Sequence, residues 1–227
     1  MDAGGVNSGS PKIVEQERSG VLLKLMDAMG YSLLNLTAGD IALMGKGFLK
    51  ETAILSANFQ GQNASFRVLR EFDHTDAQGR KFRFFGAYDG PDPRFSSARE
   101  WLAAATLPAD RTCVLLYYAD RQPDAETKGF LKKFDAVIAN VNLPEDVPAF
   151  VPLAKGKQVA VLSVQDKKRV SGRDILVDEH VIGDPEMLDL AWREQSALSK
   201  RVDELERTQY LRMSPEEFIK SYQKESQ

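Results

Sequence analysis

Two short segments narrow the possible folds of this chain more than its other features do: residues 113–118, which are apolar throughout, and residues 136–141, which are apolar except for Asn140. A strand that is apolar along its whole length must be covered on both faces, as happens in a parallel sheet flanked by helices. Between the two runs, residues 127–134 have the pattern of a short helix. The sequence therefore predicts an α/β fold with these two strands inside a sheet.

Other segments continue the alternation of helices and strands. The spacing of apolar residues from Val14 to Met29 predicts an amphipathic helix that ends at Gly30. Two strand-like segments separated by a polar loop, 66–72 and 81–85, predict a hairpin and hence some antiparallel pairing. Asp40 is placed to cap a helix over residues 41–50, although Gly45 and Gly47 disfavour it. Further strands are expected at 32–36, 52–59, 158–164 and 174–177, the last two joined through Gly172, and a further helix at 96–106.

The tail, residues 184–227, is predicted to be a helical appendage to an α/β domain of residues 1–183. It has two helix-start patterns, beginning at Asp184 and at Ser214. Apolar residues from Leu188 to Leu205 recur at helical spacing. We expect this stripe to pack on the parent domain, and the alternative is a protein partner or self-association as a coiled coil.

The composition excludes several classes of site. One cysteine and two histidines are too few for a zinc module, a disulfide scaffold or a metal pair held mainly by imidazoles. The net charge of −3 gives no reason to expect nucleic acid or an anionic membrane as partner. No apolar run approaches the ~20 residues that span a bilayer, and the first residues show no export signal. As written, the chain is expected to be cytoplasmic.

Four polar residues are the candidates for a functional pocket. In open α/β sheets, ligands bind near the carboxyl ends of the strands. The residues that the predicted strands place there are Asp40, Asp120, Asn140 and Asn142. Cys113 lies inside an apolar run and is expected to be an inert core thiol, and His74 is expected to be a surface turn residue.

Several segments also follow one another in the order found in one known family. Residues 29–40 read MGYSLLNLTAGD, residues 55–59 read LSANF and residues 134–140 read FDAVIAN. They resemble "mGYDavnlGNHE", "lSANi" and "iDviigGHtH" of the 5′-nucleotidase branch of the calcineurin-like metallophosphoesterases. Segments that resemble this family's hairpin, its "vvlLsHlG" strand and its closing strands follow at 66–87, 113–120 and 158–178.

The metal ligands that this resemblance implies are absent at the matching positions. The family uses two divalent metal ions, held by acidic, asparagine and histidine side chains. Its first strand, with an Asp-x-His motif, has no counterpart, because the sequence begins after it. At the other motif positions stand Gly5, Ala38, Gly39, Asp40, Tyr118, Val141 and Leu143, of which only Asp40 is a metal-binding type.

The resemblance predicts a phosphoesterase-like layered sandwich with mixed β-sheets, lacking the first strand, plus C-terminal helices. It also predicts a non-catalytic protein with no metal cofactor, which serves in binding or assembly. A small phosphorylated ligand remains open as a partner. The alternative is an active metal-dependent phosphomonoester or nucleotide hydrolase with a rebuilt or truncated site. If residues are missing before Met1, a periplasmic or exported protein is expected instead, as is common in this family.

Overall fold

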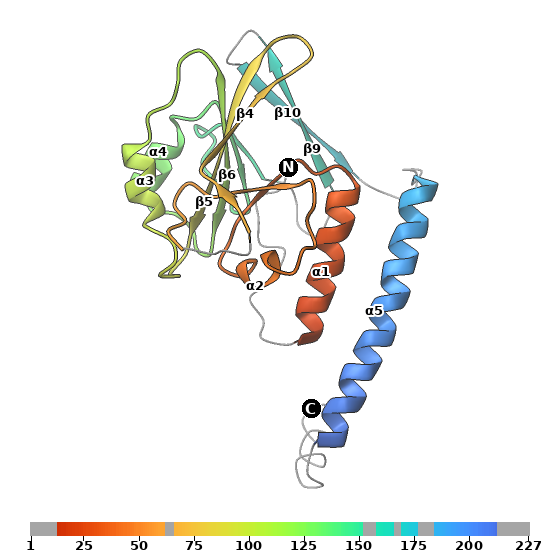
Figure 1. Cartoon of the computed structure of the whole chain (residues 1–227). Helices are drawn as coiled ribbons and strands as arrows, with labels where there is room; N and C mark the ends of the chain where they lie inside the picture. The colour runs from red at the N-terminus through yellow and green to blue at the C-terminus, as the bar shows by residue number, and fades with distance from the viewer. Residues whose placement is uncertain (1–12, 62–65, 152–157, 166–168, 177–183, 213–227) are drawn as a thin grey trace.

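The computed structural model describes residues 13–61, 66–151, 158–165, 169–176 and 184–212, and has an α/β fold with a long C-terminal helix (Figure 1). The larger sheet has the strand order β4-β5-β6-β7-β8, with β4 antiparallel to β5 and the other neighbours parallel. A smaller sheet has the order β1-β2-β3 and is parallel, and β9 and β10 form an antiparallel hairpin. The strands are β1 Leu33–Asn35, β2 Ala53–Leu55, β3 Val68–Leu69, β4 Glu71–Thr75, β5 Lys81–Asp89, β6 Thr112–Ala119, β7 Ala136–Ala139, β8 Ala149–Phe150, β9 Gln158–Gln165 and β10 Arg169–Leu176.

The two larger sheets and four helices stack as four layers. On one face of the five-stranded sheet, Leu115 and Tyr117 pack with residues of α3 (Ala98–Ala104) and α4 (Ala125–Leu131). On its other face, Val114 and Leu116 pack against the three-stranded sheet. The far side of that smaller sheet is covered by α1 (Ile13–Ala28) and α2 (Ile41–Met44). The predicted α/β sandwich with mixed sheets is therefore confirmed.

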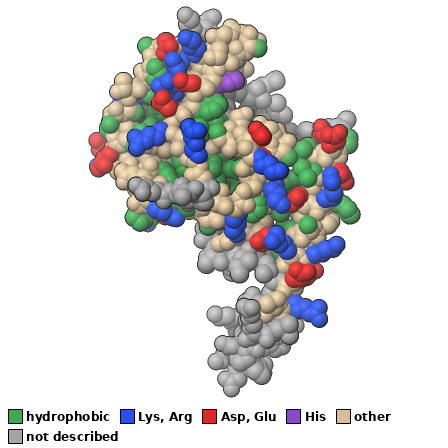
Figure 2. Space-filling model, in the orientation of Figure 1, with side chains coloured by type: hydrophobic (Ala, Val, Ile, Leu, Met, Phe, Trp, Pro, Cys, Tyr) green, Lys and Arg blue, Asp and Glu red, His purple; other side chains and the backbone are tan. Residues whose placement is uncertain are grey.

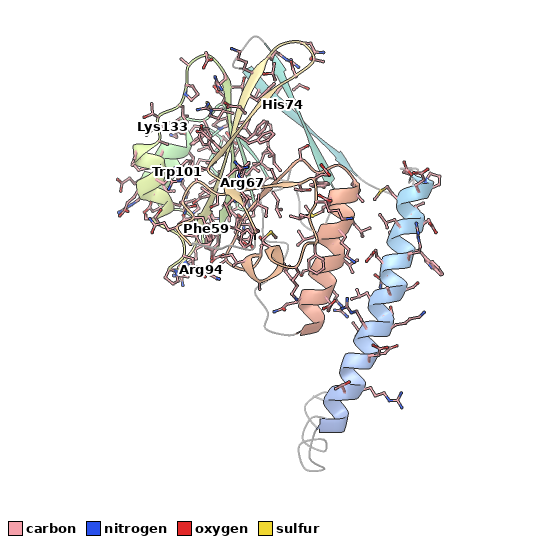
Figure 3. The ribbon with its side chains drawn as sticks, in the orientation of Figure 1. Phe59, Arg67, His74, Arg94, Trp101 and Lys133 are labelled. Atoms are coloured by element: carbon pink, nitrogen blue, oxygen red, sulfur yellow. The ribbon has the colours of Figure 1, made fainter. Side chains whose placement is uncertain are left out.

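The crossover predicted from the two apolar runs is present as β6-α4-β7, with its two strands parallel. Every side chain of β6 is buried except Tyr118, which is half-buried. On the outside of this unit, Lys133 lies near Trp101 of α3 in Figure 3, and its Nζ donates to the carbonyls of Leu102 and Ala103 at 3.2 and 3.0 Å. A cation at a helix C-terminus satisfies carbonyl groups that have no partner within the helix.

Several predicted boundaries are wrong. The strand expected at 52–59 ends at Leu55, and the strand expected at 66–72 is divided into β3 and β4, which belong to different sheets. The helix expected over 41–50 ends at Met44, because Gly45 follows it and Gly47 adopts a positive φ of 70° that favours glycine. The strand expected at 81–85 runs on to Asp89, because the three-stranded sheet supplies partners for its second half. Gly172 lies within β10 and does not join two strands.

The second half of β5 is where the two sheets are joined. β4 pairs with β5 only as far as Phe85. Beyond this point the backbone N–H of Ala57 donates to the carbonyl of Gly86 at 2.7 Å, and the side chain of Asn35 donates to the carbonyl of Ala87 at 2.9 Å. The smaller sheet thus satisfies backbone groups that β4 leaves without a partner.

Asn58 makes the next link along β5. Its buried side chain donates to the carbonyl of Tyr88 at 2.8 Å and accepts from the N–H of Tyr88 at 3.1 Å, as the backbone of a neighbouring strand would. The same amide nitrogen donates to the carbonyl of Ser96 at 2.8 Å. One side chain therefore connects the end of β5 with the segment that leads into α3.

The tail forms α5 (Pro185–Arg212), which lies along α1 and extends beyond it (Figure 1). The helices are antiparallel, since Lys24 pairs with Glu194 at 3.0 Å and Glu17 pairs with Arg201 at 3.1 Å. Side chains of both charge signs follow α5 in Figure 2. Within the described ranges, no helix is both long and apolar enough to cross a membrane.

The stripe predicted on the tail faces two environments. Leu198 is buried against α1, whereas Leu188 is exposed, as is Trp192 one turn further on. Self-association or binding of a protein partner through this helix stays a prediction, as does the division of the chain at residue 183. His180 and the helix expected after Ser214 lie outside the described residues.

Replacement of Gly86 by alanine is expected to lower the free energy of unfolding by about 1–3 kcal/mol. A Cβ atom at this position would lie 2.5 Å from Asn35 Oδ1 and 2.8 Å from the carbonyl oxygen of Leu55, and the latter cannot move without shifting the sheet. Urea denaturation measures the change.

The matched control is Gly129→Ala in α4, where a Cβ atom would meet nothing within 4 Å. This substitution is expected to leave stability unchanged or to raise it by up to about 1 kcal/mol, because alanine is the better helix former. Equal losses in the two variants would contradict the close approach of the sheets at Gly86.

Candidate functional site

A polar cavity of about 430 Å³ lies beyond the carboxyl ends of β5 and β6. This is the edge at which open α/β sheets bind their ligands. Its walls come from the segments after β5 and β6 and from the starts of α3 and α4. They include three carboxylates and two guanidinium groups, contributed by Asp89, Asp120, Asp124, Arg99 and Arg121.

Two of the carboxylates are held by tyrosines in a reciprocal arrangement between neighbouring strands. Tyr88 of β5 donates its hydroxyl to Asp120 Oδ2, which follows β6, at 2.5 Å. Tyr117 of β6 donates to Asp89 Oδ2, at the end of β5, also at 2.5 Å. Gly90 permits the first contact, because a Cβ atom there would lie 2.1 Å from the hydroxyl oxygen of Tyr88.

Both tyrosines are kept neutral by their surroundings. Burial, followed by the hydrogen bond to Asp120, raises the pKa of Tyr88 well above its ordinary value. Burial and the hydrogen bond to Asp89 do the same to the pKa of Tyr117. A phenol beside a carboxylate resists ionisation because a second negative charge would be repelled. The two hydroxyls therefore act as fixed hydrogen-bond donors that orient the carboxylates.

Of the remaining charged groups on the cavity wall, Arg99 and Asp124 have polar partners, whereas Arg121 has no ion-pair partner among the described residues. Arg99 pairs with Glu126 at 3.1 Å and lies 3.8 Å from Asp124. Asp124 also caps α4 by accepting from the N–H of Thr127 at 2.7 Å. Arg121 forms no ion pair with a described residue. The cavity can bind a polar ligand through these groups, but its described walls hold no imidazole or thiol to act as base or nucleophile.

The structure does not bring the four predicted pocket residues together. Asp120 lines the cavity. Asn140 lies at the end of the neighbouring strand, where its side chain accepts from the N–H of Ala119 at 2.8 Å and donates to the carbonyl of Ala119 at 3.0 Å. It therefore positions the residue before Asp120 and does not line the cavity itself. Asn142 is exposed and lies outside the cavity wall.

Asp40 belongs to the other sheet. It is fully buried after β1, and its Oδ2 accepts from the hydroxyl of Thr37 at 2.7 Å and from the N–H of Thr37 at 3.3 Å. The residue occupies the N-cap position of α2, but its side chain makes no capping bond. The predicted cap is therefore wrong, because the carboxylate turns back to Thr37.

Sequence reasoning missed Asp89, Arg99 and Arg121 as neighbours of Asp120. The rule that selected Asp120 would also have selected Asp89, had the strand been followed to its true end. The segment predicted from the sequence, 81–85, ends just before Gly86 and so leaves Asp89 out. Arg99 has no comparable signal, since the first turn of a helix commonly carries charged residues.

Four of the positions that correspond to the family's metal motifs are packed with apolar groups, whereas Asp40 is held by Thr37 and Gly5 lies outside the described residues. Ala38 and Tyr118 lie against a cluster that contains Tyr88 and Phe95. The ring of Tyr88 lies 6.3 Å from that of Tyr118 and 4.7 Å from that of Phe95. Farther along the sheet, the matching positions Val141 and Leu143 are partly buried against the α3–α4 core.

This environment does not fit a pair of divalent ions, which need several oxygen or imidazole ligands directed at one point. Among the described residues, no group of three or more His, Cys, Asp or Glu side chains is placed to hold a metal. His74, on β4, pairs with Phe82 in register and is exposed.

Comparisons with known proteins support the fold. No protein-family model and no curated protein matches the sequence. Among solved structures, a proposed 5′-nucleotidase from Staphylococcus aureus, in complex with α-ketoglutarate, matches with a TM-score of 0.51 and 14% identity over 77% of this chain. The match covers 44% of that protein, so this chain spans less than half of its length. The fold resembles that of a proposed 5′-nucleotidase, as the order of sequence motifs predicted.

The reciprocal tyrosine–carboxylate pairs predict an abnormal alkaline titration. In the folded protein, Tyr88→Phe is expected not to change the tyrosinate absorbance that develops up to pH ~11. The reason is that a phenol with a raised pKa stays neutral at a pH where ordinary tyrosines ionise. Tyr117→Phe is expected to behave in the same way. In denaturant, each variant should lose the signal of one of the six tyrosines. A loss of about one sixth of the signal near pH 10 in the folded Tyr88→Phe variant would contradict the pairing.

Proposed function

We propose that this protein is a non-catalytic, 5′-nucleotidase-like member of the metallophosphoesterase group, which serves in binding or assembly. The observation that carries the proposal is the aromatic packing around Tyr118 and Ala38, at positions where the resembled family has metal ligands. Phosphoester hydrolysis in that family requires both ions, to activate a hydroxide and to stabilise the phosphoryl charge. Aromatic and methyl groups supply neither function.

The polar cavity supports binding as its remaining role. Asp89 and Asp120 are oriented by tyrosine hydroxyls, so their positions are fixed before a ligand arrives. Preorganised groups lose little entropy on binding. Arg121 provides an available positive charge on the same wall. These features suit a small polar ligand with both donor and acceptor groups, which includes the phosphorylated compounds that the family resemblance suggests.

An active hydrolase with a rebuilt or truncated site is the second candidate. The observation that favours it is the pair of carboxylates, Asp89 and Asp120, at the edge where catalysis takes place in related folds. Two carboxylates with water can hold one hard cation, although a second ion would need ligands from elsewhere.

A hydrolysis assay with Mn²⁺, Zn²⁺ or Co²⁺ separates the two candidates. With p-nitrophenyl phosphate and nucleoside monophosphates as substrates, we expect turnover within about tenfold of the metal ion in buffer alone, whereas enzymes commonly reach 10⁶-fold or more. Mass spectrometry of the purified protein is expected to find no stoichiometric transition metal.

Asp120→Asn is the diagnostic variant, because its side chain lies at the cavity and outside the hydrophobic core. We expect the wild-type and variant proteins to show the same background rate. Metal-dependent turnover that disappears in Asp120→Asn, together with two equivalents of bound metal in the wild type, would establish the hydrolase.

A further inference from the structure

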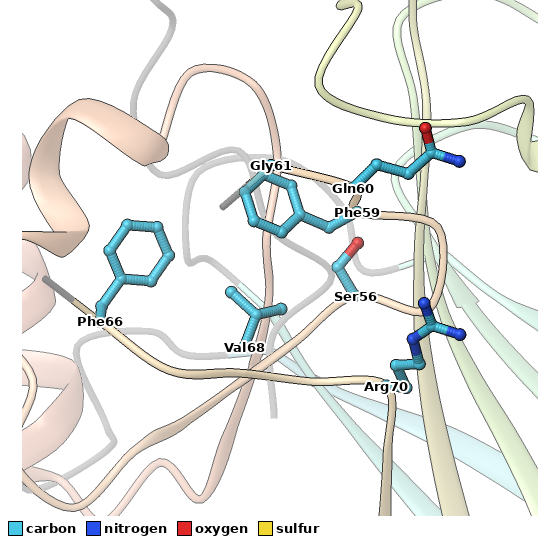
Figure 4. Close-up of a pocket in the computed structure, with 7 residues that line it drawn as sticks. All are labelled: Ser56, Phe59, Gln60, Gly61, Phe66, Val68 and Arg70. Atoms are coloured by element: carbon cyan, nitrogen blue, oxygen red, sulfur yellow. The ribbon is translucent and has the colours of Figure 1, made fainter. Parts of the chain in front are cut away.

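A second cavity lies at the carboxyl edge of the three-stranded sheet. It measures about 230 Å³ and is lined by Ser56, Phe59, Gln60, Gly61, Phe66, Val68 and Arg70 (Figure 4). Ser56 directly follows β2 and Arg70 directly follows β3, and these two strands are parallel. The cavity therefore occupies the same kind of position on the small sheet as the polar cavity does on the large one.

The strand register explains which side chains meet there. Ile54 pairs with Val68 and Leu55 pairs with Leu69, and the N–H of Ser56 donates to the carbonyl of Leu69 at 2.9 Å. Side chains two residues apart on a strand share a face. Ser56 follows Ile54 by two positions, and Arg70 follows Val68 by two. Ser56, Val68 and Arg70 therefore point to the side of the sheet that α1 covers.

One end of the cavity is aromatic. Figure 4 shows the rings of Phe59 and Phe66 at this end, with Val68 beneath them. The ring of Phe59 is held by an edge contact with Phe95, with centroids 5.2 Å apart. Gly61 leaves room for it, because a Cβ atom there would lie 2.5 Å from the Phe59 ring. A rigid aromatic wall of this kind favours a flat ring, which can stack or meet it edge to face.

The other end is cationic and polar. Arg70 is exposed and forms no ion pair with a described residue. The nearest acidic residue in sequence, Glu71, pairs with Arg83 at 3.1 Å. Ser56 is buried beside Arg70, and its hydroxyl donates to Asn58 Oδ1 at 3.3 Å, so its proton is engaged and Arg70 is the group at this end that can donate to a ligand. A guanidinium group without a carboxylate partner suits an anion, which it can bind with two parallel hydrogen bonds.

We propose that this cavity binds a small planar aromatic anion, with the ring against Phe59 and Phe66 and the anionic group on Arg70. The volume sets the size of the ligand, because cavities for drug-sized molecules measure about 300–1,000 Å³. A cavity of about 230 Å³ accommodates one ring with its substituent. The shared chemistry is an aryl carboxylate or an aryl phosphate. The inference goes beyond the proposed function, since it holds whether or not the chain hydrolyses phosphoesters.

Calorimetric titration of the full chain with benzoate and with phenyl phosphate, in buffer with EDTA, tests the proposal. We expect a Kd of about 0.1–1 mM for at least one of them, as is usual for a ligand of this size. The better ligand identifies carboxylate or phosphate as the anionic group. Inorganic phosphate, cyclohexanecarboxylate and benzyl alcohol should bind at least about tenfold more weakly, because each lacks the ring, its flatness or the charge.

Arg70→Gln is expected to weaken binding tenfold or more, as loss of a charge-assisted contact does. Arg67→Gln is the matched control, because Arg67 is also exposed and without an ion pair among the described residues, but lies outside the cavity lining (Figure 3). It should change the Kd less than about twofold, a ratio that separates a specific contact from general electrostatic attraction.

A second readout locates the ligand without relying on a variant. In amide NMR spectra, benzoate is expected to shift the signals of Gly61, Val68 and Arg70, and to leave those of Asp89 and Asp120 unchanged. The proposal is overturned if neither aryl anion binds below about 10 mM, if Arg67→Gln and Arg70→Gln weaken binding equally, or if the shifts map to the polar cavity. The assay contains no metal and measures no turnover, so its failure is separate from any failure of the proposed function.

Discussion

The contact between the second half of β5 and the smaller sheet holds the two sheets together. β4 ends its pairing with β5 at Phe85, and from there Ala57, Asn35 and Asn58 supply the hydrogen-bond partners. Buried backbone groups without partners would cost several kcal/mol in total. The two sheets therefore cannot separate or slide without breaking several bonds together. Gly86 makes the contact close enough, since even a methyl group would collide with backbone atoms of β2.

The same contact decides the chemistry at the edge of the sheets. It fixes Tyr88 at the end of β5, with its hydroxyl on Asp120 and its ring between Phe95 and Tyr118. The space between the carboxyl ends of the two sheets is thereby filled by aromatic side chains. A scaffold of this kind can be preserved while its reaction is lost, because fold and function are carried by different residues. The proposed binding role rests on the aromatic and methyl groups that stand where the resembled family has metal ligands.

The two cavities differ in the ligands that they suit, although each lies at the carboxyl edge of parallel strands. The larger one is lined by three carboxylates and two arginines. Hydrogen bonds from tyrosines of β5 and β6 hold two of these carboxylates in place. The smaller one is aromatic at one end and cationic at the other. The two cavities therefore suit different chemical groups, and they lie at the edges of different sheets.

The elements that could be predicted from the sequence are those whose pattern of buried residues is visible within one segment. The run from Cys113 to Tyr118, the helix after it and the strand from Ala136 were predictable, because a strand covered on both faces must be apolar throughout. The long tail helix was predictable from its cap and its spacing. The order of motifs also indicated the phosphoesterase-like architecture, which the structural comparison supports.

The end of β5 and the side chains that meet beyond it depend on how the two sheets pack, which no single segment of the sequence reveals. Asn58 and Tyr88 are 30 residues apart, and Tyr117 and Asp89 are 28 apart. Pairs so far apart in the chain produce no repeating pattern in the sequence. Each partner resembles an ordinary residue of its own segment. The sequence identifies the candidate Asp120 because it follows an apolar run, whereas Asp40, predicted for the same pocket, is buried in the segment that joins β1 to α2. Periodicity reports which face of an element is buried, and only the packing of sheets reports what that face or edge meets.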